Sequence, residues 1–406
     1  MRGGLDATLA ARRAAREAAG RQRVVHAFEP IGGCRVRHGD AELVDFCSND
    51  YLGLAREAAP GGSPGGDRGG PVPPAGAAAS PLVSGYGPGH ARLAARLAEF
   101  LGAEAALLVA SGYQANLALG QALLGRGEAV LADRLNHASL NDGARLAGAR
   151  IHRYAHADAA DAERRLDGRT RWLASDAVFS MDGDIAPLTE LAALADREGL
   201  GLWIDDAHGF GVTGPDGRGA VAESGVRTDA LVITFGKALG TQGAAILGER
   251  ALVDELVNTA RGIIYSTAPA PLLVDATERA LTRLQREFWR RERLSESIDR
   301  FRTACARNDI RLGHSTTPIQ PVILGDDRRA LQAADALAER GFLVRAIRPP
   351  TVPEGRARLR ITLSAAHEPA DIDGLVAALA AALSTASTDA APAAPAKRAV
   401  PPETPA

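Results

Sequence analysis

A lysine stands where an apolar stretch of the chain ends. The segment "VITFGKALG" runs from β-branched and aromatic residues through Gly236 to Lys237. Lysine is seldom fully buried unless a partner or a chemical role holds it there. A second apolar stretch, "LWI", ends in Asp205 and is soon followed by His208. An amine, a carboxylate and an imidazole at the ends of strands are groups that can bind a charged ligand and move protons.

The elements that must position these residues alternate along the middle of the chain. Continuous apolar strands and amphipathic helices follow each other there, which indicates an α/β domain with a mostly parallel sheet. The sequence predicts strands at 105–110, 129–133, 171–179, 200–208 and 229–235, and helices at 113–124 and 188–199. Ligands bind beyond the carboxyl ends of the strands in such sheets. We therefore expect Asp205, Lys237, His137 and the turn "SGYQAN" (111–116) to meet in one crevice.

These groups suit pyridoxal 5'-phosphate (PLP). A lysine whose pKa is lowered by burial can form a Schiff base with the PLP aldehyde. Asp205 would keep the pyridine nitrogen protonated, and the start of the helix after Ser111 would bind the phosphate. Each residue alone has a simpler explanation: Asp205 as a cap, Lys237 reaching the surface along its apolar stem, His137 as an ordinary helix-start residue. Their occurrence together and in this order favours the cofactor.

Two short motifs suggest other ligands and are rejected. "GFGVTG" (209–214) matches the dinucleotide pattern G-x-G-x-x-G, but polar residues separate it from its strand and Pro215 disfavours the helix that should follow. The pair "GK" at 236–237 lacks the earlier glycine and the following hydroxyl residue of a P-loop. His152 and His156 could share one helix face, yet no third ligand lies near them, so we expect surface histidines and no metal.

Composition excludes several classes of partner. The 406 residues include 47 basic and 49 acidic ones, and a net charge of -2 favours neither nucleic acid nor an anionic membrane as a partner. No apolar run approaches the roughly 18 residues that span a bilayer. Cys34, Cys47 and Cys305 form no C-x-x-C pair, which predicts a reduced compartment, the cytoplasm.

The remaining segments predict the domain organisation. After about residue 290 the pattern of strands and helices restarts as a smaller α+β domain, with strands near 318–324, 342–347 and 357–363. We expect five parts: an N-terminal helix and small-domain segment at 1–60, a Gly/Pro-rich loop at 61–79, a large PLP-binding domain at 80–290, a C-terminal small domain at 291–383 and a disordered tail at 384–406.

Ten blocks of sequence, taken in order, resemble the α-oxoamine synthases, a family of fold-type I PLP-dependent transferases. The resemblance runs from about Leu9 to Leu383. Its blocks are "FCSNDYLGL", "LVSGYGPGH", "SGYQAN", "DRLNHASL", "VFSMDGD", "DDAHGFGVTG", "TFGKALG", "YSTA", "RPPTVP" and "ARLRITLSAAH". It departs from the family in the Gly/Pro-rich segment, where relatives have an ordered helix, and at Asp176, where many relatives have glutamate.

The resemblance assigns roles to individual residues. Lys237 matches the lysine that carries PLP, and Asp205 matches the acid at the pyridine nitrogen. His208 matches a histidine at the ring hydroxyl, with Ser180 beside it, and His137 matches a histidine stacked on the ring. The other matches are Gly112, Tyr113 and Thr234 near the phosphate, and Thr351, Arg360 and Arg21 near the substrate, with Arg23 as the alternative to Arg21.

The resemblance also implies an activity and partners. It implies a decarboxylative condensation of L-alanine with a pimeloyl thioester, carried by an acyl carrier protein or coenzyme A, as in the branch that serves biotin biosynthesis. The alternative is another branch, such as one that joins glycine to an acetyl group. Ala207 and Gly209 favour alanine, because relatives that use glycine and acetyl groups tend to have serine and alanine there. The family implies a homodimer in which Ser266 or Thr267 reaches the phosphate of the partner.

Overall fold

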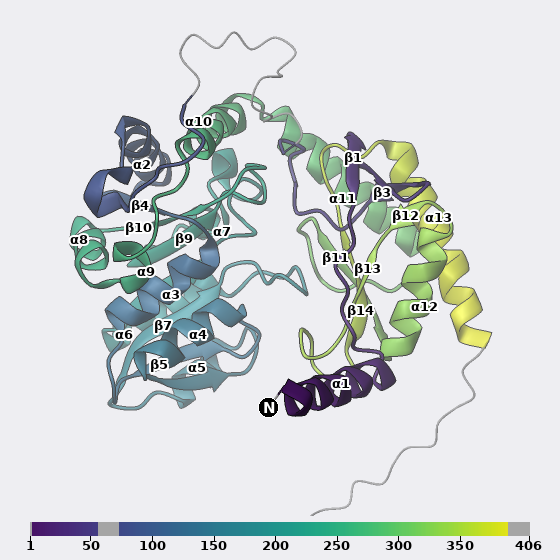
Figure 1. Ribbon diagram of the computed structural model, residues 1–406, viewed down its shortest axis with the longest axis horizontal. Helices are drawn as coiled ribbons and strands as arrows, with labels where there is room; N and C mark the ends of the chain where they lie inside the picture. Colours follow the sequence, from purple (N-terminus) through teal and green to yellow (C-terminus); the bar gives the residue numbers. More distant parts are fainter. Residues whose placement is uncertain (1, 56–72, 389–406) are drawn as a thin grey trace, which may run out of the picture.

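The chain folds into two bodies of unequal size. The computed structural model describes residues 2–55 and 73–388. The larger body holds a seven-stranded sheet, and the smaller one holds two small sheets (Figure 1). Helices α10 (Pro271–Arg286) and α11 (Trp289–Arg307) connect them. Among the described residues, no helix is both long and apolar enough to cross a membrane.

The large sheet is parallel except for one strand. Its order is β4 (Ala105–Val109), β10 (Ala244–Gly248), β9 (Ala230–Thr234), β8 (Gly201–Asp205), β7 (Thr170–Asp176), β5 (Ala129–Asp133) and β6 (Arg150–Tyr154). Strand β10 runs antiparallel to both of its neighbours, and the other pairings are parallel. The predicted α/β class with a mostly parallel sheet is confirmed. The sequence did not predict β6, which alternates with charged residues at one edge, or the short, alanine-containing β10.

Helices cover both faces of this sheet, because alternate residues of each strand enter different apolar cores. In β9, Leu231 and Ile233 pack on one side with residues of α2 (Pro88–Leu101), α6 (Leu188–Glu198), α7 (Ala220–Ser224) and α10. Ala230 and Val232 pack on the other side. That core also contains residues of α3 (Gly112–Leu123), α4 (Ala138–Ala147), α8 (Arg250–Thr259) and α9 (Arg261–Ile264). Helix α5 (Ala159–Arg164) contacts α6 and β6.

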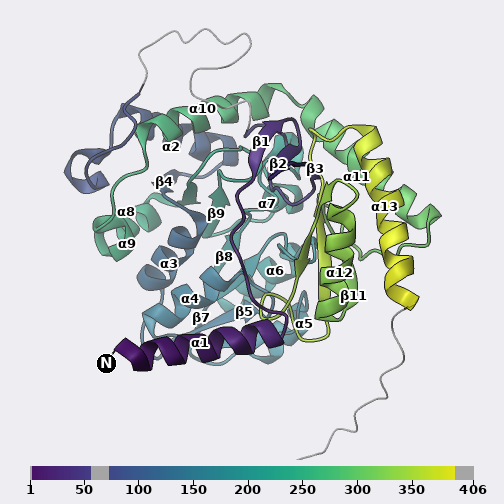
Figure 2. The same ribbon diagram turned by 45° about the vertical axis from the view of Figure 1, so that its right-hand side comes forward.

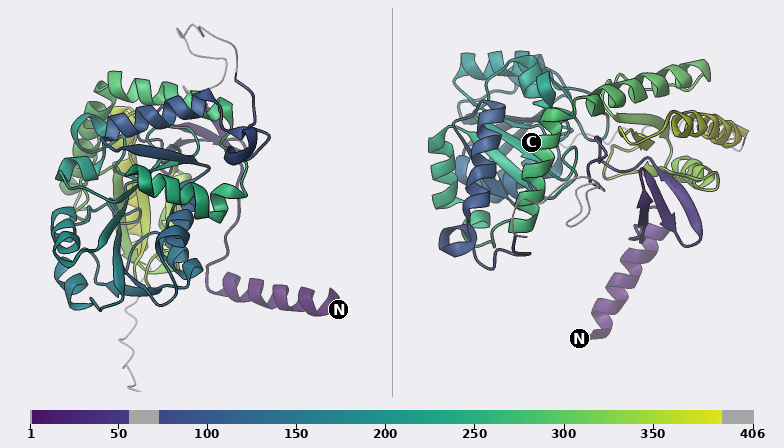
Figure 3. Two further views of the ribbon diagram at one scale, coloured as in Figure 1. Left: turned by 90° about the vertical axis from the view of Figure 1, so that its left-hand side faces the viewer. Right: turned by 90° about the horizontal axis from the view of Figure 1, so that it is seen from above.

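The small body contains segments from both ends of the described chain. One antiparallel sheet has the order β11 (Ile319–Gly325), β14 (Ala357–Thr362) and β13 (Arg345–Ile347). The second has the order β1 (Glu29–Gly32), β2 (Arg35–His38), β3 (Ala41–Asp45) and β12 (Phe342–Leu343), with β12 parallel to β3. Helices α11, α12 (Asp327–Ala338) and α13 (Pro369–Thr388) pack in the same body (Figure 2). Helix α1 (Arg2–Ala18) projects away from the rest (Figure 3).

Three predicted segments differ from the structure. The strand expected at 342–347 is two strands, because the chain leaves the sheet of β3 after Leu343 and joins the sheet of β14 at Arg345. Helix α13 continues to Thr388, so a tail that begins at 384 starts too early, and residues 389–406 lie outside the described residues. The expected loop at 61–79 lies outside the described residues up to 72, and residues 73–79 form neither helix nor strand.

Candidate active site

Lys237 lies just beyond the carboxyl end of β9. Strand β9 ends at Thr234, and the Lys237 Nζ donates a hydrogen bond to the Thr234 Oγ1 at 3.2 Å. Burial lowers the pKa of the Lys237 amine, and the nearby Asp205 and Asp176 oppose that shift only in part. A buried amine with a lowered pKa has a larger neutral, nucleophilic fraction at physiological pH.

Asp205 ends the neighbouring strand β8 and is held by donors on both carboxylate oxygens. The Asn116 Nδ2 donates to Asp205 Oδ2 at 2.6 Å, and the Ala207 N–H donates to Asp205 Oδ1 at 3.0 Å. Asn116 is itself oriented, because its Oδ1 accepts from the Trp203 Nε1 at 3.2 Å. The sequence prediction missed Asn116 and Trp203. The available signal was an amide side chain inside the apolar helix that follows "SGYQ".

His137 belongs to the same network from the start of α4. Its backbone N–H donates to Asp176 Oδ2 at 2.8 Å, and its Nδ1 lies 2.7 Å from the Ser139 Oγ. That hydroxyl also accepts from the Asn116 Nδ2 at 2.8 Å. Desolvation of its ring by the surrounding protein lowers the pKa of His137, although the residue keeps an exposed surface. The Ser139 N–H donates to the Nδ1 at 3.4 Å, so the neutral ring carries its proton on Nε2. Asp205 and His137 are therefore joined through Asn116 and Ser139.

Asp176 supports His137 from the end of β7. Its backbone N–H donates to the Asn136 Oδ1 at 3.0 Å while its carboxylate accepts from the His137 N–H, so the 136–137 segment is fixed at two points. Burial, together with the charge of Asp205, raises the pKa of Asp176 well above its usual value. The carboxylate of Asp176, which is shorter than the glutamate of many relatives, thus has a defined partner, the backbone N–H of His137.

His208 lies in the loop after β8 and contacts a residue far away in sequence. The strand ends at Asp205 and not at His208 as predicted. The His208 Nδ1 is 2.6 Å from the Tyr51 hydroxyl. Burial, then the charge of Lys237, lowers the pKa of His208 well below its usual value, and burial raises the pKa of Tyr51 to about 12. Both groups are neutral at pH 7, and the Tyr51 hydroxyl donates to the Asn49 Oδ1 at 3.3 Å, so its oxygen can accept a hydrogen bond from the His208 Nδ1. The sequence prediction assigned no role to Tyr51.

Gly112 begins helix α3 in a space that excludes any larger residue. A Cβ at Gly112 would lie 2.6 Å from the Thr234 Cγ2. The first backbone bond of this helix runs from Ala115 N–H to Ser111 C=O, so the N–H groups of Gly112 and Tyr113 precede the helical pattern. A helix start with such N–H groups attracts a phosphate. We call the N–H groups of Gly112 and Tyr113 the phosphate cradle. Together with the half-buried amine of Lys237 and the fixed carboxylate of Asp205, the phosphate cradle fits PLP.

Arg360 lies on β14 and reaches across from the small body. Its Nε donates to the Ser180 C=O at 2.6 Å, its Nη1 donates to the Thr362 Oγ1 at 2.9 Å, and its Nη2 donates to the Asn49 Oδ1 at 3.1 Å. The Tyr51 hydroxyl lies 3.3 Å from the same Asn49 Oδ1, which connects Arg360 to His208. Ser180 takes part through its backbone, and the expected approach of its side chain to His208 stays a prediction.

The two candidate arginines near the N-terminus have different surroundings. Arg21 forms ion pairs with Asp327 at 3.1 Å and Glu354 at 2.7 Å. Arg23 instead donates from its Nη2 to the Thr351 Oγ1 at 3.2 Å. The structure thus brings Thr351 to Arg23 and not to Arg21.

The rejected dinucleotide motif and the histidine pair have structural roles or partners. In "GFGVTG", a Cβ at Gly209 would lie 2.1 Å from Asp206 Oδ1, so the loop needs glycine to pass over this buried carboxyl. Burial raises the pKa of Asp206 to about 8. The histidine prediction was wrong about secondary structure, because His152 lies in β6 and His156 in the loop after it. Both are half-buried, and each faces an aspartate.

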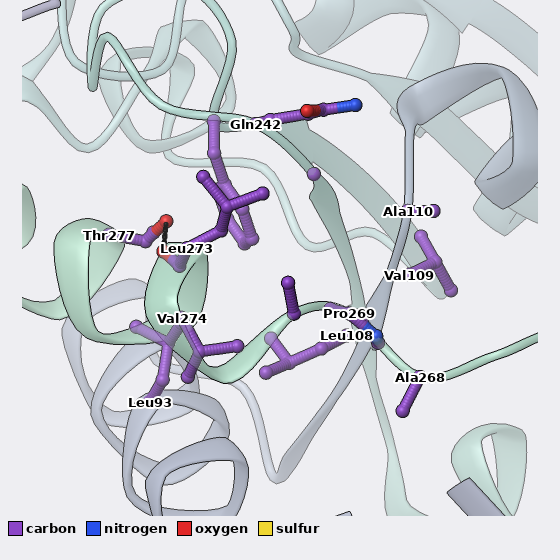
Figure 4. Close-up of a pocket in the computed structure, with 13 residues that line it drawn as sticks. Leu93, Leu108, Val109, Ala110, Gln242, Ala268, Pro269, Leu273, Val274 and Thr277 are labelled. Atoms are coloured by element: carbon purple, nitrogen blue, oxygen red, sulfur yellow. Dashed lines mark hydrogen bonds between the residues drawn. The ribbon is translucent and has the colours of Figure 1, made fainter. Parts of the chain in front are cut away.

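A separate apolar pocket lies between α2, α10 and the ends of β4 and β10 (Figure 4). Its volume is about 150 Å³. Leu93, Leu273 and Val274 line it, with Gln242 and Thr277 as polar neighbours. None of the residues that surround it is among the predicted site residues, so the pocket is distinct from the cluster around Lys237.

Comparison with known proteins gives the same family throughout. The profile described as "Aminotransferase class I and II" matches residues 41–379. The 8-amino-7-oxononanoate synthase of Alkalilimnicola ehrlichii is 50% identical over 387 residues, which cover 93% of this chain and 98% of that protein. The enzyme of the same name from Halorhodospira halophila is 47% identical and covers 93% and 95%.

Solved structures agree in fold. A serine palmitoyltransferase from S. paucimobilis with bound PLP-myriocin superposes with a TM-score of 0.84 at 26% identity, over 94% of this chain and 98% of that one. An 8-amino-7-oxononanoate synthase from Francisella tularensis superposes with a TM-score of 0.71 at 27% identity, over 84% and 98%.

Proposed function

The chain belongs to the class I and II aminotransferase family, and within it we propose an 8-amino-7-oxononanoate synthase of biotin biosynthesis. The enzyme is a PLP-dependent acyltransferase that joins L-alanine to a pimeloyl thioester. The alanine Cα bonds to the acyl carbon, the thiol leaves, and the alanine carboxyl group is lost as carbon dioxide. The observation that carries the proposal is a sequence identity of 47–50% with enzymes of that name over 93% of the chain. The placing of Asp205 and His137 in one hydrogen-bond network, with Lys237 just beyond the end of the neighbouring strand, supports it.

The residues of the site divide the work of this reaction. PLP, when bound, supplies an electron sink for the negative charge that forms at the alanine Cα. The Lys237 Nζ holds the cofactor and then accepts the proton from that carbon. Asp205, fixed by Asn116, holds the proton on the pyridine nitrogen. The Arg360 guanidinium can bind the amino-acid carboxylate through two parallel hydrogen bonds, and the first turn of α3 binds the phosphate.

A release assay tests the choice of substrates. The purified enzyme is given L-alanine or glycine, each with acetyl, succinyl and pimeloyl thioesters of coenzyme A and of acyl carrier protein. We expect alanine with pimeloyl to turn over fastest. Faster turnover of glycine with acetyl would assign the chain to the other branch. Gly209 does not bear on this choice, because its contact with Asp206 alone requires glycine.

Arg23 is the proposed ligand of the distal acyl carboxylate. Arg21 is neutralised by two carboxylates, whereas the Arg23 side chain bonds to the neutral Thr351 hydroxyl. Losing a charge-assisted bond costs about 1.5–3 kcal/mol. We expect Arg23→Gln to raise the KM for the pimeloyl thioester about tenfold or more. Arg21→Gln is the matched control and should change this KM less than threefold. The reverse order would assign the role to Arg21.

A homodimer is also proposed, with a contact surface next to the phosphate cradle. Val83 is 79% exposed, Leu82 51% and Tyr265 73%. Leu82 and Val83 lie on the short π-helix Pro81–Gly85, and Tyr265 follows α9, which contacts that π-helix. Adjoining exposed apolar residues of this kind are typical of an interface. Light scattering should give twice the mass of the 42.2 kDa chain. Val83→Glu should shift it toward monomer, whereas Phe288→Glu, equally apolar but between α10 and α11, should not.

A further inference from the structure

One loop of the large body carries a series of contacts to the small body. We call residues 179–185 the clasp loop. The Ser180 C=O accepts from Arg360, and the Met181 C=O and Asp182 Oδ1 accept from the Arg358 Nη1 at 3.1 Å and 2.6 Å. These contacts mean that the position of the clasp loop sets where two arginines of β14 lie.

The next residue of the clasp loop continues the series. The Gly183 C=O accepts from the Ser315 Oγ and from the Thr317 Oγ1, each at 2.9 Å. A Cβ at Gly183 would lie 2.3 Å from the Ile319 C=O oxygen, so the loop packs closely on the start of β11. Four successive residues, 180 to 183, are therefore bound by the small body.

His156 fixes the base of this loop from the other side. Its Nε2 lies 2.7 Å from Asp184 Oδ2, and its Nδ1 lies 3.1 Å from Asp133 Oδ1 at the end of β5. Its ring also meets the Phe179 ring edge-on at 4.4 Å between centroids. The Phe179 N–H donates to the Asp184 C=O at 2.9 Å, which closes the base. His156 thus contacts both ends of the clasp loop and ties them to the sheet.

The geometry requires a charged imidazole. Both ring nitrogens face carboxylate oxygens, and only the doubly protonated ring can donate to both. Burial alone would lower the pKa of His156, but the hydrogen bonds to Asp133 and Asp184 outweigh it and raise that pKa to about 9. The cation also offsets the negative charge of Asp133, which is buried.

We propose that His156 is a positioning residue for amino-acid binding, which holds the clasp loop so that the Ser180 carbonyl orients the Arg360 guanidinium. The proposal rests on the proposed function in one respect, the assignment of the substrate carboxylate to Arg360. His156 itself does not touch the substrate. It acts through the Asp184 contact, the loop backbone and the Arg360 Nε bond.

The test compares His156→Gln with His152→Gln in the holoenzyme. His152 is the matched control, because it lies in β6 with Asp167 at 3.8 Å and bonds to the Arg165 C=O. Spectral titration with L-alanine should show about tenfold weaker binding for His156→Gln, with PLP retention unchanged. Hydrogen exchange should be faster in the peptide that covers 179–185. Neither change is expected for His152→Gln.

A double-mutant cycle separates positioning from general stability. Asp184→Ala should also weaken alanine binding, and the double variant should be no worse than His156→Gln alone, because each change removes the contact between His156 and Asp184. Additive losses, or a lower melting temperature with unchanged alanine affinity and exchange, would overturn the proposal. The titration needs no acyl donor. If the wild-type enzyme binds alanine but does not use pimeloyl thioesters, the proposed function is wrong. The role of His156 is then still decided by the alanine affinity and the hydrogen exchange of its variants.

Discussion

Replacing Lys237 by alanine is expected to abolish turnover while leaving the fold intact. Loss of the group that accepts the Cα proton removes a factor on the order of 10²–10⁴, and loss of the covalent hold on PLP adds to it. Stability should not fall, because the Nζ of the half-buried Lys237 makes its hydrogen bond to one neutral partner, Thr234 Oγ1, and desolvation lowers the pKa of the amine. Activity and the melting temperature of the variant measure the two effects separately.

The covalent attachment of PLP to Lys237 can be measured directly. The chain contains two lysines, Lys237 and Lys397. Borohydride reduction followed by intact-mass measurement should show one PLP adduct on the native protein and on Lys397→Ala, and none on Lys237→Ala. An adduct that survives in the Lys237 variant would move the attachment point to another amine.

Replacing Asp205 by asparagine should have the second-largest effect. A neutral amide cannot hold the proton on the pyridine nitrogen, so the electron sink weakens. We expect a loss of several kcal/mol of transition-state stabilisation, where about 1.4 kcal/mol corresponds to tenfold in rate. Both oxygens of Asp205 accept from donors, so the new NH₂ group must face Asn116 or Ala207 and lose one bond. This mismatch adds about 1–3 kcal/mol of destabilisation, which denaturant unfolding will show.

Asp206 supplies the matched control for this variant. It is the next residue and is also buried, yet its Oδ2 accepts from the Val221 N–H at 3.4 Å, on the side of the "GFGVTG" loop. Burial raises its pKa to about 8, so it is mostly neutral at pH 7, and asparagine resembles it in charge. Asp206→Asn should therefore keep most of the turnover. A larger loss for Asp206→Asn than for Asp205→Asn would exchange the two assignments.

The sequence predicted best what depends on neighbouring residues. Each strand of the site is a short apolar run followed by polar residues, so Asp205 and Lys237 could be placed at the carboxyl edge from local pattern alone. His137 was expected beside them from the segment that follows the strand at 129–133, and the family motifs then added the roles of His208, Gly112 and Thr234. The α/β fold class and the alternation of strands and helices followed from the same local signals.

Residues whose partners lie far away in sequence were not predictable in this way. Tyr51 meets His208, and Asn116 meets Asp205, only after the sheet has formed. The choice between Arg21 and Arg23 depends on where Asp327 and Thr351 lie relative to the segment after α1. The direction of β10 could not be inferred either, because a short alanine-containing strand has the same pattern in both directions.

The place of β10 between β4 and β9 also governs when the protein can acquire its cofactor during synthesis. Strand β4 leads into the phosphate cradle at the start of α3. Within residues 2–55 and 73–388 its one sheet neighbour is β10, and Val109 pairs with Ala244. On a ribosome that adds about 5–20 residues per second, the roughly 135 residues between them take on the order of ten seconds. During that interval the emerging chain has the start of α3 but no β9 or β10 to hold it, and Thr234 and Lys237 have not yet been made. A nascent chain stalled before β10 should therefore fail to retain PLP, whereas one released after α10 has emerged should begin to bind it.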